Sequence, residues 1–573
     1  MARVERVDGY LPLRDYALIG DGQTTALVGR DGAVDWLCLP NPDSPPIFDR
    51  LLDARDGGSF QLAPAEPFDA VRRYRAGSNV VQTTFTTAAG AVRVTDAMVV
   101  GDPSQRLLVR LVDGLAGEVT MRVHFEPRYD FGRSDAAEAE PELTTWSADG
   151  GEFRIAAGAR ATFALRAGSV GSAPLSRERV ERDVEHTSAL WLEWSGRAAY
   201  DGPWREAVVR SALVLKLLTF APSGAIVAAP TTSLPERLGG SLNWDYRYSW
   251  LRDGIYTMRA LLALGYVEEA DAFFRWQMRA TEPTAPEVSP LYRIDGSGSL
   301  GEEEVQVPGY RSSRPVRIGN AASDQLQLDN YGHLLESAAR LRAHVVSLGT
   351  DVGRRLAGFA DFVEAAWRQP DAGIWEVRDE LYHFVQSKAM CWTALDRAAK
   401  LAQQGALPDR GAAWRRAADE VREWIETEGW DDERQTYRRA PGHPDPTDSA
   451  LLSLALCAYS SPSEGRFLAT EEGVRRELGA GGPLLYRTPS SRGTEGAFLT
   501  CSFWLVDALG RAGRVEEGHE LMSELVELAN DVGLYSEQLD PGTGEFLGNF
   551  PQGLVHLALV NAAVSLAGGT EEE

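Results

Sequence analysis

Two glutamates in this 573-residue chain stand close behind aromatic residues in segments that read as loops. Glu376 follows Trp375 in DAGIWEVRDELYHFVQSK, and Glu537 comes two positions after Tyr535 in GLYSEQLDPGTGEFLGNF. A carboxyl group beside an indole or phenol ring is partly desolvated, which raises its pKa and suits it to general acid catalysis. Since a loop glutamate is more often a solvated surface residue, the surrounding elements must decide between these two interpretations.

Residues 241–254 combine aromatic and charged side chains. The segment reads SLNWDYRYSWLRDG and places Tyr246 and Trp250 ahead of Arg252 and Asp253. Aromatic rings stack on the apolar faces of sugars, while Arg and Asp can bind neighbouring hydroxyls as donor and acceptor. The segment therefore predicts a sugar subsite. The alternative is that its rings cap a core and its charges form an internal ion pair.

The elements that would position these residues change character along the chain. From about Asp15 to Val180, short alternating runs rich in Val, Thr and Phe are separated by Gly, Asp and Pro. This pattern predicts the half-buried antiparallel strands of a β-sandwich. After about Ala199 the pattern becomes one of amphipathic segments of helix length. We therefore divide the chain into residues 1–198, a β-sandwich with a linker, and residues 199–573, a helical domain.

The helical half contains twelve predicted helices, over residues 204–220, 253–264, 266–280, 324–346, 352–368, 387–403, 412–427, 447–459, 465–478, 495–512, 515–530 and 551–567. No fixed sequence period relates them, so a closed ring of six helical hairpins is favoured over an open solenoid. In such a ring, all connections from odd-numbered to even-numbered helices emerge at one end, and these connections are the long ones. Long loops in a compact domain are usually functional, which predicts the site at this end.

The loops of Glu376 and Glu537 both open at that end, half a ring apart. Carboxyl groups that face each other at about 6.5–9.5 Å leave room for a water molecule, the geometry of inverting glycosidases, whereas retaining pairs lie about 5 Å apart. Inversion is expected if the longer distance holds.

Charge and composition exclude several classes of protein. A net charge of -25 repels phosphate backbones and anionic lipids, so nucleic-acid and membrane partners are not expected. The N-terminal stretch lacks the apolar region of a secretory signal, which predicts a cytoplasmic protein. The eight histidines show no HExxH-like spacing, and no CxxC pair occurs among Cys38, Cys391, Cys457 and Cys501. No metal site is therefore expected.

Four motifs, WDYRYSWLRD, GIWEVR, YSEQ and GNFPQ, occur in this order, and together they resemble glycoside hydrolase family 15, the glucoamylase and trehalase family. The segment RDYALIGDGQTTALVGRDGAVDWLCLP is similar to the β-sandwich start of the bacterial members. The resemblance implies an N-terminal super-β-sandwich followed by an (α/α)6 barrel. It also implies that Glu376 is the general acid, that Glu537 is the general base, and that no cofactor is needed.

The predicted substrate-binding side chains come from several loops: Tyr246, Trp250, Arg252, Asp253, Asn320, Gln325, Trp375 and Arg487. Arg252 and Asp253 match the family's pair that holds the non-reducing-end glucose, and Arg487 in LLYRTPSS resembles the arginine that approaches the same ring. Asn320 and Gln325 match the family's pocket more loosely. The alternative for these two is that they cap the helix that follows them.

We expect an inverting, exo-acting hydrolase that releases β-glucose from the non-reducing ends of short α-glucans, in the manner of a glucoamylase. The YSEQ form around Glu537 favours this activity over an α,α-trehalase, because some trehalases carry YAEE there. Trehalase and an α-1,6 isomaltooligosaccharide hydrolase stay open as alternatives. The pair of glutamates argues against a catalytically dead sugar-binding protein and against an (α/α)6 phosphorylase. The substrate would be a small oligosaccharide or disaccharide, and the sequence leaves the oligomeric state open, a homo-oligomer included.

Overall fold

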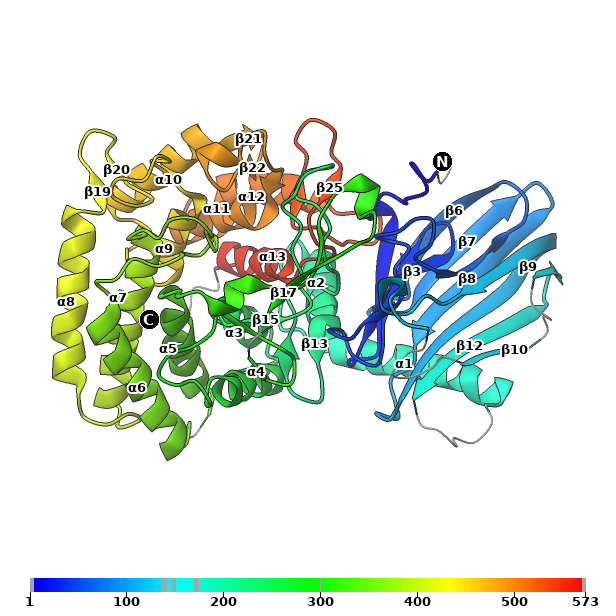
Figure 1. Cartoon of the computed structure of the whole chain (residues 1–573), viewed down its shortest axis with the longest axis horizontal. Coiled ribbons are helices and arrows are strands. Elements are labelled where there is room, and N and C mark those ends of the chain that lie inside the picture. Colours follow the sequence, from blue (N-terminus) through cyan, green and yellow to red (C-terminus); the bar gives the residue numbers. More distant parts are fainter. Residues whose placement is uncertain are drawn as a thin grey trace.

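The computed structural model describes residues 5–135, 142–146, 151–168, 175–298, 300–345 and 347–568. The chain first forms a β-rich part, drawn in blue and cyan, and then a helical part beside it, drawn from green to red (Figure 1). One continuous cluster of buried apolar side chains runs through both parts.

The β-rich part is an antiparallel sandwich, as predicted. Its strands are β1 (Tyr16–Gly20), β2 (Thr25–Gly29), β3 (Ala33–Cys38), β4 (Pro46–Phe48), β5 (Ser59–Pro64), β6 (Phe68–Tyr74), β7 (Val81–Thr87), β8 (Gly90–Met98), β9 (Gln105–Glu126), β10 (Glu142–Trp146), β11 (Glu152–Ala156) and β12 (Arg160–Gly168). They form one curled sheet in the order β1-β2-β3-β5-β9-β8-β7-β6, with β4, β10, β11 and β12 paired beside this path. The 22-residue strand β9 passes from one layer to the other, since its first half pairs with β12 and its second half with β5.

The alternating pattern of the sequence explains which faces are buried. In β7, Val81, Thr83 and Phe85 are buried while the residues between them are half-buried. Strands β1, β2 and β3 are buried along their whole length. They lie between the sandwich interior and the helical part, where the indole of Trp36 donates to the main-chain oxygen of Pro230 (2.7 Å). This strand trio therefore supports the helical part directly.

A helix, α1 (Arg177–Gly196), lies where the sequence analysis expected the linker. Val180 and Val184 pack against an apolar patch on β8, β9 and β12, so the helix covers a sheet face. At its other end Trp194 stacks on Tyr266 of the helical part, with ring centroids 4.2 Å apart. Helix α1 thus contacts both parts of the chain, and the domain boundary after residue 198 stays a prediction.

Within the described residues, the helical part contains twelve helices that correspond one for one to the predicted ones. They are α2 (Arg205–Leu218), α3 (Gly254–Ala263), α4 (Val267–Ala280), α5 (Asp329–Arg342), α6 (Thr350–Ala366), α7 (Val385–Gln403), α8 (Gly411–Thr427), α9 (Ser453–Leu456), α10 (Gly465–Leu478), α11 (Leu499–Arg511), α12 (Val515–Glu527) and α13 (Gly553–Leu566). The predicted helix over 447–459 is the most broken one, since a 3-10 helix, η5 (Ser449–Leu452), precedes the short α9.

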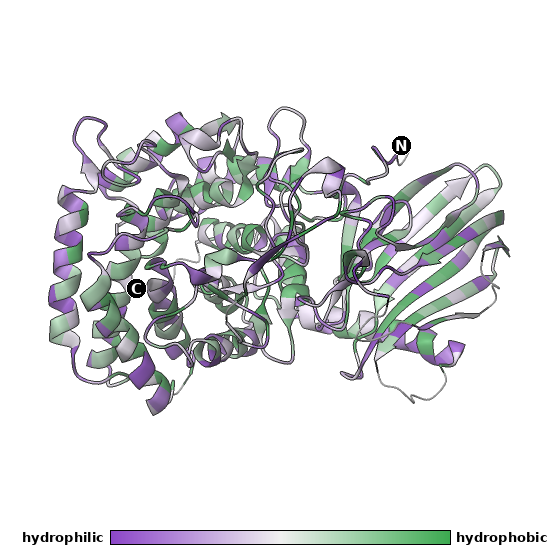
Figure 2. Cartoon of the chain, in the orientation of Figure 1, coloured by the Kyte–Doolittle hydropathy of each residue, from purple (hydrophilic) through white to green (hydrophobic). Residues whose placement is uncertain are grey.

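The helices close into a ring, which confirms the (α/α)6 barrel over the open solenoid. Helices α3, α5, α7, α9, α11 and α13 form the inner ring, in which each packs on the next and α13 packs on α3. Nearly every residue of α13 is buried, whereas the outer helix α8 buries only one stripe. Figure 2 shows hydrophilic residues along α8, at the edge of the molecule. Amphipathic outer helices and largely apolar inner helices are what a double ring requires.

The connections from outer to inner helices are long, as predicted, and they carry short strands. These are β13 (Thr219–Phe220), β14 (Ala225–Ile226), β15 (Ser249–Trp250), β16 (Leu291–Tyr292), β17 (Glu302–Val305), β18 (Val316–Gly319), β19 (Trp430–Asp431), β20 (Thr436–Tyr437), β21 (Gly479–Gly481), β22 (Leu484–Leu485), β23 (Ala497–Phe498), β24 (Gln538–Leu539) and β25 (Phe546–Leu547). Among the described residues, no helix has both the length and the apolar character needed to cross a membrane.

Candidate active site

A cavity of about 490 Å³ lies among the long connections of the barrel. All six connections from an outer to an inner helix contribute to its wall, through Trp250, Asn320, Glu376, Arg439, Arg487 and Glu537 among others. Its volume falls in the range of small-molecule sites. The predicted position of the site, at the end where the long loops emerge, therefore coincides with a real cavity.

Glu376 lies in the connection between α6 and α7. Its Oε1 accepts hydrogen bonds from the indole of Trp250 (2.7 Å) and from Arg252 Nη2 (3.1 Å). Its backbone has φ +57°, a left-handed conformation that is uncommon for a residue with a side chain and that clusters at functional sites. The amide of Gln325 donates to the main-chain oxygens of Glu376 and Val377 (3.3 and 3.1 Å). The 241–254 segment thus holds the carboxyl group, and Gln325 holds the main chain beside it.

Gln325 itself does not line the cavity. Its amide is occupied with the two main-chain oxygens behind the wall, and its Oε1 accepts from Gln327 (3.0 Å). It therefore supports the loop of Glu376, whereas the sequence analysis placed it against the sugar. Asn320 does line the cavity, and at the same time its side chain caps the 3-10 helix η4 (Ala321–Asp324) by accepting from the amide of Ala322 (3.0 Å).

Glu537 immediately precedes β24, the central strand of the three-stranded sheet β23-β24-β25. Its side chain is 1% exposed, and its Oε1 accepts from the hydroxyl of Tyr246 (2.7 Å). Burial raises the pKa of Glu537 to about 7, although Arg487 and the Tyr246 hydroxyl act in the opposite direction. The aromatic partner of Glu537 is therefore Tyr246, whereas the sequence pointed to Tyr535, whose ring contacts Phe503 and His556 instead.

The aromatic residues of the 241–254 segment connect the two carboxyl groups. Trp250 contacts Glu376, Tyr246 contacts Glu537, and the Tyr246 and Trp250 rings meet edge to face with centroids 5.4 Å apart. Both glutamates line the same cavity. One short segment therefore orients both groups.

Arg252 and Asp253 also line the cavity, but they do not form the ion pair of the alternative interpretation. Arg252 pairs with Glu376. Asp253 is 9% exposed, and burial raises its pKa to about 6, with Arg252 opposing the shift. Trp375 forms another part of the wall, where its indole donates to Asp448 (2.8 Å) and its ring lies 5.4 Å from that of Phe498.

Arg487 lines the cavity between two acidic residues that the sequence analysis missed. Its Nε donates to Glu495 (2.7 Å), and its Nη2 donates to Glu236 (2.6 Å). Glu236 stands in SLPERLGG and Glu495 in PSSRGTEG, and neither segment carries a local signal of function. Their importance is visible only from their contacts with Arg487.

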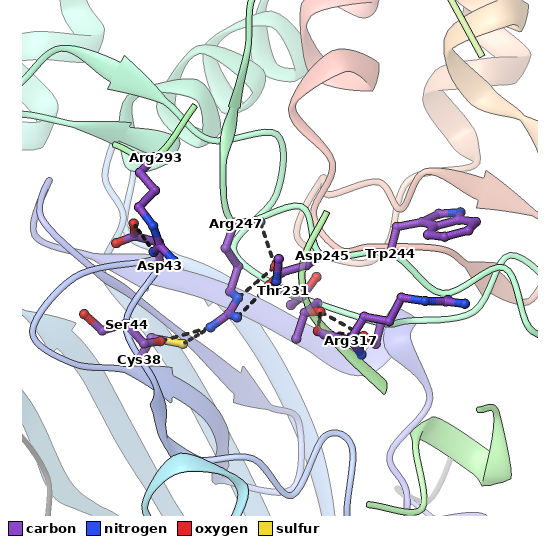
Figure 3. A network of polar contacts seen from close by, with 12 residues as sticks. Cys38, Asp43, Ser44, Thr231, Trp244, Asp245, Arg247, Arg293 and Arg317 are labelled. Carbon is purple, nitrogen blue, oxygen red and sulfur yellow. Dashed lines mark hydrogen bonds and ion pairs between the residues drawn. The ribbon is translucent and has the colours of Figure 1, made fainter. Parts of the chain in front are cut away.

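The internal ion pair of the alternative interpretation exists elsewhere in the segment, between Asp245 and Arg247. Arg247 Nη2 lies 2.7 Å from Asp245 Oδ2, and both side chains are buried. Arg247 Nη1 also donates to the main-chain oxygen of Ser44 in the β-sandwich (2.9 Å). Figure 3 shows Arg247 between Asp245 and the Cys38–Ser44 region. The segment therefore has two roles, since some of its residues line the cavity and these two anchor it.

The cavity combines two carboxyl groups with cationic and aromatic side chains. This set can protonate a leaving oxygen, activate a water molecule and bind sugar hydroxyls. Among the described residues, no group of three or more His, Cys, Asp or Glu side chains could hold a metal ion.

Comparisons with known proteins agree with this chemistry. The family model described as glycosyl hydrolases family 15 matches residues 202–564, and a model described as trehalase-like, N-terminal matches residues 8–161. The chain is 37% identical to a trehalase of Mycolicibacterium smegmatis, over 98% of this chain and 92% of that protein. It is 33% identical to a trehalase of Thermoplasma volcanium, over 98% of this chain and 94% of the relative.

A solved structure of a bacterial glucoamylase complexed with acarbose has the same fold. It matches with a TM-score of 0.67 at 13% sequence identity, over 99% of this chain and 97% of the other. The family model covers more than half of the chain and nearly all of the barrel, and the site is built from the loops of that barrel. The chain therefore belongs to glycoside hydrolase family 15 and is a glycoside hydrolase.

Proposed function

We propose that this chain is an inverting α-glucoside hydrolase whose substrate is trehalose. The observation that carries the choice of substrate is the similarity to proteins named trehalase along 98% of the chain. This choice departs from the glucoamylase activity that the YSEQ motif favoured, because a full-length similarity is a broader signal than two residues beside the base.

In the proposed reaction, Glu376 donates its proton to the glycosidic oxygen as the bond between that oxygen and C1 breaks. Glu537 removes a proton from a water molecule, whose oxygen forms the new bond to C1 from the opposite face. Attack from that face gives β-glucose. The second glucose of trehalose departs with its own C1–O bond intact and is released as the α-anomer.

The charged wall of the cavity would hold the sugar that is attacked. Arg252, Asp253 and Arg487 offer donors and an acceptor for its hydroxyls, and Trp375 offers an aromatic face. Negative charge around C1 would also stabilise the oxocarbenium-like transition state.

Glucoamylase-type hydrolysis of α-1,4 links is the second candidate, favoured by the YSEQ motif that contains Glu537. Glucose release from trehalose, maltose, maltotriose, isomaltose and soluble starch distinguishes the candidates. We expect trehalose to be cleaved with the highest kcat/KM. Cleavage of maltotriose and starch without cleavage of trehalose would overturn the proposal in favour of the second candidate.

The stereochemistry has its own test. Proton NMR during early turnover of trehalose should show equal amounts of α- and β-glucose before mutarotation mixes them. In water enriched in ¹⁸O, the label should enter the β-anomer alone. Initial formation of α-glucose only, with the label in it, would show retention and would remove Glu537 from the role of base.

A further inference from the structure

Arg487 is surrounded by carboxylates on two sides. Its Nε and Nη2 contact Glu495, and Nη2 also contacts Glu236. The guanidinium also lies over the rings of Trp375 and Phe498. The centroids of these rings are 5.4 and 5.2 Å from the guanidinium carbon. Among the described residues, none accepts a hydrogen bond from Nη1, and the residue lines the cavity. This arrangement fixes the guanidinium and leaves one nitrogen available to a ligand.

Glu236 is the more buried of the two acidic partners, with 1% of its surface exposed. Its Oε1 accepts from the indole of Trp244 (3.0 Å), and its Oε2 accepts from Arg487 (2.6 Å) and from the amide of Gln538 (2.8 Å). Gln538 is the residue after Glu537. The contacts of Glu236 therefore reach the Arg487 loop and the Glu537 loop at once.

Three carboxyl groups share the environment of the single Arg487 guanidinium. Glu236, Glu495 and Glu537 lie around Arg487, so the full ionisation of all three would leave two charges uncompensated in a buried region. Burial raises the pKa of Glu236 to about 8, against the effect of Arg487, and both Glu495 and Glu537 raise it further. Neighbouring carboxyl groups of this kind titrate as a unit, because each ionisation makes the next one harder.

We propose that Glu236 is a positioning residue of the hydrolytic reaction: it fixes the Arg487 guanidinium for the sugar and sets the pH at which Glu537 becomes fully ionised. The proposal rests on the role of Glu537 as the base. Glu236 and Glu537 share the positive charge of Arg487 and titrate as a pair, so either carboxyl group can be the one that ionises first. The full ionisation of Glu537 is therefore delayed to higher pH than it would be without Glu236.

The other charged and titratable groups that face Glu537 act in known directions. Tyr246 donates a hydrogen bond to it and Arg487 attracts its negative charge, and both favour ionisation, whereas Glu495 repels it. Glu376 lies elsewhere on the wall, paired with Arg252. A change at Glu236 leaves all of these groups in place, so its effect on the pH profile can be measured separately.

Glu236→Gln removes the competing charge and keeps the shape of the side chain. The acidic limb of the profile of kcat/KM against pH should move to lower pH by about 0.5–1 unit, because Glu537 then ionises without a negative neighbour. KM should rise by up to about tenfold, since Arg487 loses one of its anchors. Glu236→Asp withdraws the carboxyl group by one methylene. The midpoint of its acidic limb should lie between those of the wild type and Glu236→Gln. This variant replaces Glu236→Gln if Glu236→Gln does not fold.

Glu336→Gln is the matched control. Glu336 on α5 is also a buried glutamate, 2% exposed, paired with Arg340 (2.7 Å) and with Arg397, and it does not line this cavity. Its loss should lower Tm and leave the midpoint of the acidic limb where it is in the wild type. An unchanged midpoint in the Glu236 variants, or an equal shift in the control, would overturn the proposal.

The test separates this proposal from the function on which it rests. The profile is recorded with whichever disaccharide the wild type cleaves, so the choice of substrate does not affect it. Substantial activity in Glu537→Gln would overturn the role of the base itself. If Glu537→Gln is inactive and the acidic limb of Glu236→Gln keeps the midpoint of the wild type, only the role of Glu236 is overturned.

Discussion

Glu376 and Glu537 occupy different environments in one cavity. The Glu376 side chain is 17% exposed and paired with Arg252, whereas Glu537 is almost fully buried and accepts from a neutral tyrosine. A raised pKa suits a proton donor more than a base, so the assignment of Glu376 as the acid and Glu537 as the base follows from the match of GIWEVR and YSEQ to the family's motifs and not from these environments.

Replacing either glutamate with glutamine tests these roles. Glu376→Gln and Glu537→Gln keep the side-chain shape and remove the titrating group, so kcat should fall by about 10²–10⁴-fold or more. Steady-state kinetics with trehalose and maltose measure the loss, and circular dichroism checks that the fold persists. Activity within tenfold of the wild type in either variant would refute the assignment of that residue.

The raised pKa of Glu537 also affects stability. Because the folded-state pKa of about 7 lies above the unfolded value, the protonated form favours the folded state, and this contribution is lost as pH rises through 7. Glu537→Gln should therefore raise Tm by roughly 1–3 °C at pH 8 and change it little at pH 4. Thermal unfolding at both pH values measures this, and an equal Tm change at both would show that burial of the charge is not the cause.

Within the connection that carries Glu537, a glycine leaves room for the base. Gly548 has φ +72°, and a Cβ atom there would lie 2.4 Å from Glu537 Oε2. Gly548 belongs to the GNFPQ motif, in which the main-chain oxygen of Asn549 accepts from the amide of Glu537 (3.2 Å). The motif thus shapes the space around the carboxyl group.

Gly548→Ala should displace Glu537 and lower kcat/KM by about 10²-fold, the scale of loss for a misplacement of about 1 Å. Gly544→Ala is the matched control, since Gly544 has φ +73° in the same connection and a Cβ atom there would meet nothing within 4 Å. Both variants carry the same backbone strain. Equal losses in the two variants would show that strain, and not contact with the base, causes the effect.

At the scale of the whole molecule, the β-sandwich contacts three of the connections that carry the site. Arg247 bonds to Ser44, the hydroxyl of Tyr10 donates to the main-chain oxygen of Gly309 (3.0 Å), and Arg14 donates to that of Ala529 (3.1 Å). These bonds reach the connections that contain Trp250, Asn320 and Glu537. The sandwich therefore supports the geometry of the cavity from outside the barrel.

Arg247→Met tests this support. It leaves the buried Asp245 without its partner, a change that costs about 3–5 kcal/mol, and it frees the segment that carries Tyr246 and Trp250. We expect a lower Tm and a loss of kcat/KM in the folded fraction. Arg293→Met is the control, because Arg293 makes a longer and more exposed bridge to Asp43 of the sandwich (3.4 Å). Its loss should cost about 1 kcal/mol or less, and a full effect of Arg247→Met on Tm without any effect on kcat/KM would limit Arg247 to a structural role.

The sequence by itself determined the elements and the end of the barrel at which the site lies. Alternation and helical periodicity are local, and they identified the β-sandwich, the twelve barrel helices and the long connections that hold Glu376 and Glu537. Helix α1 was also present as a local signal, since Val180, Val184 and Trp191 follow helical spacing, but the charged residues between them obscured it.

Only the tertiary structure decided which side chains meet in the cavity. Tyr246 and Glu537 are 291 positions apart, and Glu236 and Arg487 are 251 positions apart. Contacts at such separations depend on how the ring closes, and no local pattern encodes them. For the same reason the sequence assigns Gln325 to the sugar, whereas the residue lies behind the wall, where its amide donates to two main-chain oxygens of the Glu376 loop.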